Sequence, residues 1–254
     1  MDRLVFTAMA ALKQLNTMKL KSSNDLANAS TLGFKKTYAF ATETARVAGP
    51  GFDTRYVPMN RSNDELVIDR GPLITTGNKL NIYMRDATVM GVQAPNGQVA
   101  FTRRGDLMID AGGFITTANG HTVLQEGGGP IAVPPGADLS ITDDGSILAT
   151  DLAQPTAPPS QVGTLLLRDS EGTRLVRRVD GLYEPMAAGG QGGDFAGGTT
   201  PPSVQAGAVE GSSINVAEQL VNFMDMSRSF EIRIKMISDM KELDNSGATM
   251  MRYA

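Results

Sequence analysis

Residues 216–241 read VAEQLVNFMDMSRSFEIRIKMISDMK, and this stretch decides the fold class. Its large apolar residues recur at alternating steps of four and three, the spacing of a helix face that packs on another helix. The positions on this face are Val216, Leu220, Phe223, Ser227, Phe230, Ile234, Ile237 and Lys241. Methionines beside this face widen the apolar surface beyond what one partner helix covers. We predict a C-terminal helix with several neighbours, capped by Asn215 three residues before Glu218.

A second apolar stripe lies at the N-terminus and follows the same steps. Its positions are Leu4, Ala8, Ala11, Leu15 and Met18. Helical character fades over residues 24–33, because Asn, Asp, Ser and Thr favour caps and turns and Gly33 suits a left-handed closing position. The start, Asp2-Arg3, has no net positive charge, so the segment does not resemble a cleaved signal peptide and we expect it to be retained. The two terminal helices are expected to pair with each other and then pack against other subunits.

The middle of the chain has the pattern of short antiparallel strands. Two-residue turn signals separate its apolar runs. These signals are Asn96-Gly97, Asn119-Gly120, Asp144-Gly145 and Asp180-Gly181. Six glycines fall within residues 187–202, a composition that favours a flexible connection.

The predicted fold class is therefore α+β, with N- and C-terminal helices forming a coiled-coil-like layer around a central β-rich domain built from hairpins. The predicted organisation is residues 1–36 as N-terminal helix and closing segment, 37–75 as extended connection, 76–186 as β-rich outer domain, 187–212 as flexible Gly/Pro-rich linker and 213–254 as C-terminal assembly helix. An intramolecular helical hairpin that caps an ordinary core is the alternative interpretation of the two stripes.

Composition excludes many function classes. The 254 residues include no cysteine and one histidine, His121, which removes disulfides, Cys/His metal sites and two-histidine motifs. No apolar run approaches the ~20 residues needed to span a bilayer, and the net charge of -4 argues against nucleic-acid binding. We predict no cofactor, no metal and no catalytic residue. A carboxylate-based hydrolase stays open as a rival, with four acids at turn-like positions: Asp106, Asp110, Asp143 and Asp144.

Residues 24–35, NDLANASTLGFK, resemble the N-terminal signature of bacterial flagellar rod and hook proteins. The matching positions are Asn24, Leu26, Ala27, Asn28, Thr31, Gly33, Phe34 and Lys35; Asp25 departs from the usual Asn. Residues 1–9 and 221–236 resemble most of all the proximal-rod member of the flagellar basal-body rod protein family, and residues 101–106 and 110–124 resemble the β region that this family shares.

The resemblance implies a structural protein of the flagellum that is exported by the flagellar type III apparatus without a cleaved signal peptide. It implies a rod crossing the periplasm, with the terminal helices as an inner coiled-coil layer, the β-rich domain outside, and transmission of torque from motor to hook. The expected partners are copies of this chain, other rod subunits and the export apparatus, with neither nucleic acid nor membrane insertion. The expected assembly interface comprises Leu4, Ala8, Ala11, Leu15, Met18, Val216, Leu220, Phe223, Phe230, Ile234 and Ile237. A distal-rod or hook-family protein and a secreted oligomeric adhesin are the alternatives.

Overall fold

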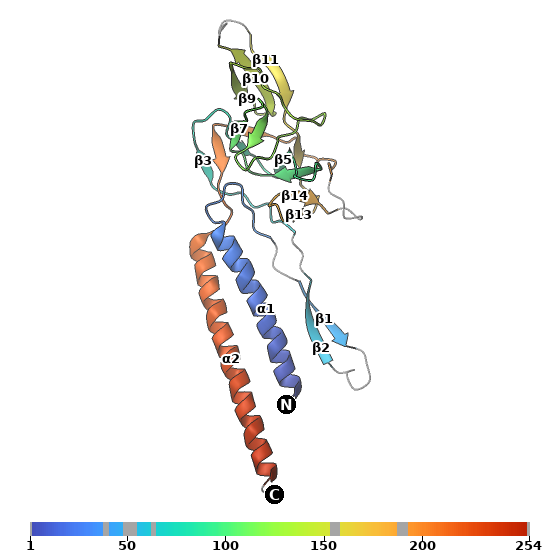
Figure 1. Ribbon diagram of the computed structural model, residues 1–254, viewed down its shortest axis with the longest axis vertical. Coiled ribbons are helices and arrows are strands. Elements are labelled where there is room, and N and C mark those ends of the chain that lie inside the picture. Colours follow the sequence, from blue (N-terminus) through green and yellow to red (C-terminus); the bar gives the residue numbers. More distant parts are fainter. Residues whose placement is uncertain are drawn as a thin grey trace. The chain divides into compact units, whose positions relative to one another are not determined.

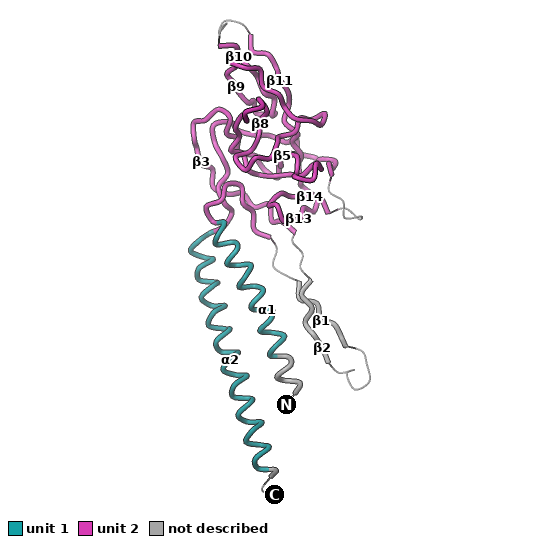
Figure 2. Tube along the Cα trace, in the orientation of Figure 1, with its two compact units in different colours: residues 1–28, 39–63, 215–254 teal, residues 29–38, 64–214 magenta. Residues whose placement is uncertain are grey.

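The computed structural model describes residues 2–37, 41–47, 55–61, 65–152, 158–186 and 193–252. The chain divides into two units, which are described separately (Figure 2). The helical unit comprises Met1–Asn28, Ala39–Asn63 and Asn215–Ala254, and the β-rich unit comprises Ala29–Tyr38 and Asp64–Ile214. Parts of the predicted connection and linker, residues 38–40, 48–54, 62–64 and 187–192, lie outside the described residues.

The helical unit contains two long helices and a hairpin. Helices α1 (Asp2–Ala27) and α2 (Val216–Arg252) lie side by side and run antiparallel (Figure 1). The predicted cap is confirmed, since Asn215 Oδ1 accepts the backbone N–H groups of Ala217 at 3.1 Å and Glu218 at 3.4 Å. Strands β1 (Ala41–Val47) and β2 (Arg55–Arg61) pair antiparallel.

The prediction of a coiled-coil-like layer is wrong. The described residues contain two helices, which form a single pair, whereas a layer needs further helices packed on that pair. The pair is joined by polar and cation–π contacts as well as apolar ones: Gln219 Nε2 donates to Ser22 Oγ at 2.8 Å. The ammonium of Lys19 lies 5.1 Å from the ring centroid of Phe223 and 5.9 Å from that of Phe230. The α+β class itself agrees with the structure.

The β-rich unit is built from short strands that pair antiparallel. In chain order they are β3 (Leu73–Thr75), β4 (Ile82–Met84), β5 (Thr88–Gln93), β6 (Val99–Thr102), β7 (Leu107–Ile109), β8 (Ile115–Thr117), β9 (Ala137–Ile141), β10 (Ser146–Asp151), β11 (Ser160–Thr164), β12 (Leu167–Asp169), β13 (Leu175–Arg177), β14 (Tyr183–Pro185), β15 (Val204–Ala206) and β16 (Ala208–Glu210). The largest sheet has the order β12-β5-β6-β14-β13, and a second has the order β11-β10-β9. Three two-stranded sheets, β15-β4, β16-β3 and β7-β8, complete the unit.

Turn chemistry explains this succession of hairpins. Gly97, Gly145 and Gly181 have φ near +80° and join β5 to β6, β9 to β10 and β13 to β14. At the fourth predicted turn Gly120 has φ +84°, and the chain returns so that Thr117 N–H donates to the His121 carbonyl at 2.9 Å. Glycine adopts this left-handed backbone without a steric penalty, so all four predicted turns are confirmed.

Two apolar clusters form the core of the β-rich unit. The larger one gathers residues from β4, β5, β6, β9 and β10, with Ile82, Met84, Met90, Val92 and Ile147 fully buried. The smaller one consists of Leu66, Val89, Phe101, Leu175 and Tyr183, with Ile68, Val99 and Phe195 packed against it. The second cluster lies beside the segment that follows α1, because the Tyr183 hydroxyl donates to the Gly33 carbonyl at 3.0 Å.

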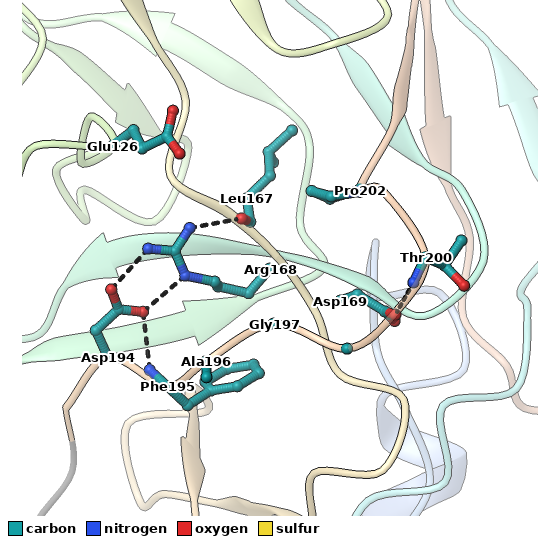
Figure 3. A pocket seen from close by; sticks show the side chains of 11 residues that line it. Glu126, Leu167, Arg168, Asp169, Asp194, Phe195, Ala196, Gly197, Thr200 and Pro202 are labelled. Atoms are coloured by element: carbon teal, nitrogen blue, oxygen red, sulfur yellow. Dashed lines mark hydrogen bonds and ion pairs between the residues drawn. The ribbon is translucent and has the colours of Figure 1, made fainter.

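Residues 193–212, which the sequence places in the linker, pack on the β-rich unit. Phe195 contacts Phe101 edge to face, with ring centroids 4.7 Å apart. Asp194 accepts two hydrogen bonds from Arg168, and Thr200 N–H donates to Asp169 Oδ2 at 3.1 Å (Figure 3). Figure 3 shows Arg168, Asp169, Asp194, Phe195 and Thr200 around a pocket. The volume of this pocket is about 530 Å³. Composition alone misses these contacts because each depends on a residue far away in the sequence.

Gly105 is expected to tolerate no side chain. A Cβ at this position would overlap the carbonyl oxygen of Ile82 in the larger core. We expect Gly105→Ala to lower the free energy of unfolding by about 3 kcal/mol, as overpacking does. Urea unfolding followed by circular dichroism measures this effect. Gly127→Ala is the matched control, because its Cβ would meet no atom within 4 Å; equal stability of the two variants would contradict the prediction.

Candidate assembly site

The signature segment, residues 24–35, starts with a compact helix end. The backbone N–H of Asn28 donates to the carbonyls of Asn24 and Asp25, each at 3.1 Å. The Asn28 side chain donates to the Asn24 carbonyl at 2.9 Å. These bonds close the last turn of α1, so Asn24 and Asn28 of the signature have a local structural role.

Gly33 lies where the backbone meets two other segments of the β-rich unit. Its φ is +67°, and a Cβ would stand 2.5 Å from the carbonyl carbon and oxygen of Arg103. Its N–H donates to the Glu210 carbonyl at 2.8 Å. Glycine is therefore required twice, for the backbone conformation and for the close approach.

Phe34 and Lys36 hold the incoming segment against the outgoing one. The Phe34 ring faces the Arg177 guanidinium, whose carbon lies 4.2 Å from the ring centroid. The Ser213 N–H donates to the Phe34 carbonyl at 3.0 Å, and the Lys36 N–H donates to Ser213 Oγ at 3.3 Å. The chain that follows α1 and the chain that precedes α2 thus run beside each other within the β-rich unit.

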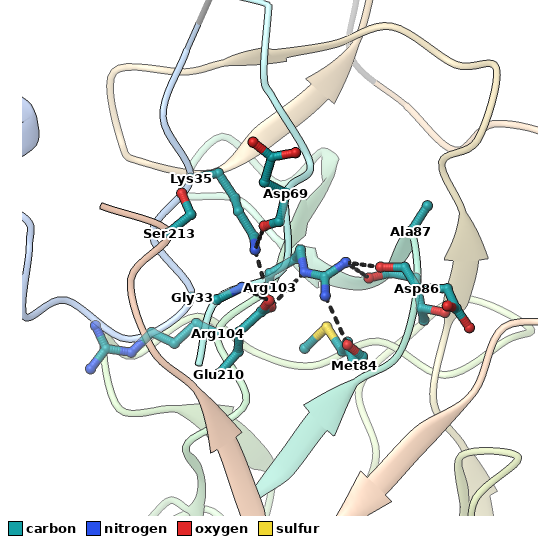
Figure 4. Close-up of polar contacts among 12 residues, drawn as sticks. Gly33, Lys35, Asp69, Met84, Asp86, Ala87, Arg103, Arg104, Glu210 and Ser213 are labelled. Carbon is teal, nitrogen blue, oxygen red and sulfur yellow. Dashed lines mark hydrogen bonds and ion pairs between the residues drawn. The ribbon is translucent and has the colours of Figure 1, made fainter. Parts of the chain in front are cut away.

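A fully buried ion-pair network lies beneath this junction and consists of Lys35, Arg103 and Glu210 (Figure 4). Lys35 Nζ lies 2.7 Å from Glu210 Oε1, and Arg103 Nε lies 2.6 Å from Glu210 Oε2. All three side chains have 0% exposure. Gly71 N–H donates to the same Oε1 at 2.7 Å, so both carboxylate oxygens are satisfied.

Backbone carbonyls complete the shell around the two cations. Arg103 donates to the carbonyls of Met84 at 2.7 Å, Asp86 at 2.6 Å and Thr88 at 3.2 Å. Lys35 Nζ also donates to the Asp69 carbonyl. Buried charge is tolerated only when it is paired and hydrogen-bonded, and this site meets both conditions.

The network contains two cations and one anion, and this excess of positive charge affects the pKa of Lys35. Burial, followed by the positive charge of Arg103, lowers the pKa of Lys35 to about 8, against the opposing effect of Glu210. Burial also raises the pKa of Tyr183 to about 12. Lys35 therefore remains a cation at neutral pH but loses its proton more readily than a lysine in water.

The predicted interface residues are distributed unevenly over the helix pair. Ala8 is buried, Ala11, Leu15 and Met18 are half-buried, and the side chain of Leu4 lies outside the described residues. On α2, Phe223, Phe230 and Ile237 are half-buried, whereas Val216, Leu220 and Ile234 are about half exposed in the single chain. Their role in assembly stays a prediction.

The signature residues also differ in how deeply they are buried. Gly33 and Lys35 are buried, and Leu26, Asn28, Thr31 and Phe34 are half-buried. Asn24 and Ala27 are exposed. The Asp25 side chain, at the position that departs from the signature, is buried.

Sequence reasoning missed Glu210, Arg103 and Tyr183 as partners of the signature. One signal was available for Glu210, which ends the otherwise uncharged run VQAGAVE over residues 204–210. A lone acid in a strand of this kind needs a buried cation. The partner could not be named, because Lys35 lies 175 residues away in the chain.

Three of the four acids of the hydrolase hypothesis, Asp106, Asp110 and Asp144, bind nearby residues through their side chains, and Asp143 contributes its backbone carbonyl. Asp106 pairs with Arg104, at 2.6 Å from Nε. Asp110 Oδ1 accepts the N–H groups of Gly112 and Phe114, and Asp144 accepts the hydroxyls of Thr142 and Ser146, which lower its pKa. The carbonyl of Asp143 accepts Val204 N–H at 2.9 Å. Among the described residues no three or more acid or histidine side chains are grouped as a metal site would require.

Within the described part of the chain, neither α1 nor α2 is both long enough and apolar enough to cross a membrane.

Stability is expected to depend on pH through Lys35. Above pH 8 the folded protein releases this proton while the unfolded chain, with a pKa near 10.5, still holds it. The free energy of unfolding therefore rises with pH, by about 2 kcal/mol between pH 8 and 9.5. Urea unfolding at a series of pH values measures this rise. The range stops short of pH 10, above which the raised pKa of Tyr183 acts in the opposite direction.

Lys35→Met is the control for this pH dependence. The variant lacks the titrating amine, so its stability should be flat over the same range. A rise of equal size in the variant would show that another group is responsible.

Two regions of the chain match models of known protein families. Residues 89–149 match the family model described as the flagellar hook protein FlgE/F/G D1 domain. Residues 205–250 match the model described as the flagellar basal body rod FlgEFG protein C-terminal. The second match covers β15, β16 and most of α2, and so includes Glu210.

Whole-chain similarity extends the match to the N-terminal segment. The flagellar basal-body rod protein FlgF of Salmonella typhimurium is 32% identical over 95% of both chains. FlgF of Escherichia coli is 31% identical over 97% of this chain and 96% of its own length. The rod protein FlgG of Buchnera aphidicola (subsp. Schizaphis graminum) is 30% identical over 85% of this chain and 87% of its own length. With helices at both ends, the β-rich unit between them and this identity over almost its whole length, the chain belongs to the flagellar basal-body rod protein family.

Proposed function

We propose that the chain is a structural subunit of the bacterial flagellar basal-body rod, where it assembles with other rod components and serves motility. The similarity to FlgF proteins over at least 95% of each chain carries this proposal, because it includes both helices and the β-rich unit. The FlgG proteins of Buchnera aphidicola (subsp. Schizaphis graminum) and Bacillus subtilis are 30% and 24% identical to this chain, below the FlgF proteins of Salmonella typhimurium and Escherichia coli, so a distal-rod role is not favoured over a FlgF-like one. Membership in this family assigns the chain no catalytic role.

The terminal helices are the proposed contacts with neighbouring subunits. In the single chain, large apolar side chains of α2 are about half exposed or more. They are Val216, Leu220, Val221, Met224, Ile232, Ile234, Met236, Leu243 and Met250. Each such side chain gains roughly 1.5–3 kcal/mol when it is fully removed from water. An extended apolar surface of this kind supports packing on further copies of the chain or on other rod subunits.

The ion-pair network supports a role in carrying load. Backbone connects the helical unit to the β-rich unit at four places, residues 28–29, 38–39, 63–64 and 214–215. Three of them, 28–29, 38–39 and 214–215, lie close in the sequence to Lys35 or Glu210, whose side chains form the buried ion pair. A rod that transmits torque needs such fixed attachment on both sides of its helices. We propose that this junction resists rotation of the attached backbone while Lys35 is docked on Glu210.

The finer parts of the role are also proposals. We place the subunit in the proximal rod, in the section that crosses the periplasm. We expect export through the flagellar type III apparatus without a cleaved signal peptide. The resemblance of residues 1–9 and 221–236 to the proximal-rod member supports this placement.

Mass spectrometry of purified, detergent-washed hook–basal bodies tests the proposed function. We expect the chain in particles from the normal strain, and loss of distal parts when its gene is deleted. Reintroducing the gene on a plasmid is the control and should restore both. Particles that lack the chain in the normal strain would contradict the rod assignment.

A substitution pair tests the helix contacts. Ile234 is 47% exposed in the single chain, and Ile234→Asp should block incorporation because it places a charge on a surface that packing would desolvate. Phe230→Asp should have the same effect. Swimming assays and the amount of chain in basal bodies measure incorporation, and the β-rich unit should remain folded by circular dichroism.

Asn222→Asp is the matched control for these variants. It adds the same charge at an exposed position of α2 but removes no apolar side chain. Normal motility of Ile234→Asp would show that this face makes no essential contact.

A further inference from the structure

The Glu210 carboxylate, which accepts a hydrogen bond from Lys35, has other donors on both of its oxygens. Glu210 Oε2 is bound by Arg103 Nε at 2.6 Å, and Oε1 is bound by Gly71 N–H at 2.7 Å. The rest of the Arg103 guanidinium is occupied by three backbone carbonyls, from residues 84, 86 and 88. Removing Lys35 would leave a neutral ion pair with hydrogen bonds on both partners.

Lys35 changes this balance when it docks. The charged groups that face its ammonium are Glu210, Arg103 and, more weakly, Asp69. The Asp69 carboxylate is 62% exposed and lies 3.8 Å from Lys36 Nζ, so it compensates little of the buried charge. The docked site therefore holds one more positive than negative charge in a region without water contact, which costs free energy that an undocked, hydrated lysine does not bear.

Outside the ion-pair site, single contacts rather than a strand ladder hold this segment. They include side-chain bonds from Tyr183 to the Gly33 carbonyl and from Arg177 to the Lys35 carbonyl, the Lys36 N–H bond to Ser213 Oγ, and one bridge between Thr37 and Leu66. Residues 29–37 form no strand or helix. Their hydrogen bonds to the β-rich unit include the Gly33 N–H to the Glu210 carbonyl, the Val67 N–H to the Lys36 carbonyl and the Ser213 N–H to the Phe34 carbonyl. Segments with few backbone bonds open locally at lower free energy than core strands.

We propose that Lys35 and Glu210 form a reversible latch, through which residues 29–37 detach from the β-rich unit while residues 64–214 stay folded. Glu210 is the fixed half, held by Arg103 and Gly71, and Lys35 is the removable half. Docking of Lys35 accompanies attachment of the chain that leads to α1 to the β-rich unit, and its buried charge makes that attachment easier to reverse. It rests on the geometry of this junction and does not depend on the proposed role in the rod.

Hydrogen exchange of the full chain, followed by mass spectrometry, tests the latch. The amides of Gly33, Val67 and Ser213 report docking, and the amides of β10 report the folded core. In the wild-type chain the reporters should exchange at least tenfold faster than β10. Equal rates would show that residues 29–37 open only when the whole unit unfolds, and would overturn the proposal.

Two substitutions and their combination test the charge balance. Glu210→Gln leaves Lys35 and Arg103 without their anion, and should speed reporter exchange by about 100-fold or more. Lys35→Met leaves the neutral Arg103–Glu210 pair, and should change reporter exchange by less than about tenfold. The double variant should exchange more slowly than Glu210→Gln alone, because it removes one uncompensated cation.

The double variant separates the latch from ordinary packing. If each side chain contributed only independent packing, the double variant would exchange faster than either single variant. That result would overturn the proposal. Equal acceleration of β10 and of the reporters in Glu210→Gln would show general unfolding of that variant, and the decision then rests on the wild-type and Lys35→Met rates.

Discussion

The buried carboxylate of Glu210 is the constraint on which the junction of this protein depends. It accepts hydrogen bonds from Lys35, Arg103 and Gly71, which come from three separate parts of the chain. A charge without solvent contact must keep a counterion, and Arg103 supplies one to Glu210 whether or not Lys35 is docked. While Lys35 is docked, the segment after α1, the strand before α2 and the connection after β6 meet at this one side chain.

Apolar packing would not align these segments by itself, because the free energy gained by burying apolar surface depends on the buried area and not on the direction of the contact. The steric fit at Gly33 and the hydrogen bond from the Tyr183 hydroxyl are directional contacts, and they specify how the segments are aligned. Gly33 approaches the Arg103 backbone more closely than any side chain allows, and Tyr183 binds its carbonyl from the second core cluster. The junction thus combines a charge, a close backbone contact and a core residue.

In the helical unit, by contrast, much of the apolar surface is exposed in the single chain. Its two helices contact each other through Lys19, Ser22, Gln219 and the rings of Phe223 and Phe230, and much apolar surface of α2 stays in contact with water. A monomeric protein rarely leaves so much apolar surface exposed. This surface supports the proposal that the chain is completed by neighbouring subunits in the rod, while the β-rich unit has its own core.

Local sequence determined the two helices, the Asn215 cap and the glycine turns, because each depends on residues that are close together in the chain. The signature at residues 24–35 also indicated the family without any structure. The prediction of a coiled-coil layer was wrong, because apolar spacing indicates that a helix face packs on another helix but does not give the number of helices that pack on it. Only the tertiary structure brought Lys35 to Glu210, 175 residues away, and showed β15 and β16 in the predicted linker. Long-range pairing of this kind depends on where the whole chain places its buried charges, and no local pattern encodes that position.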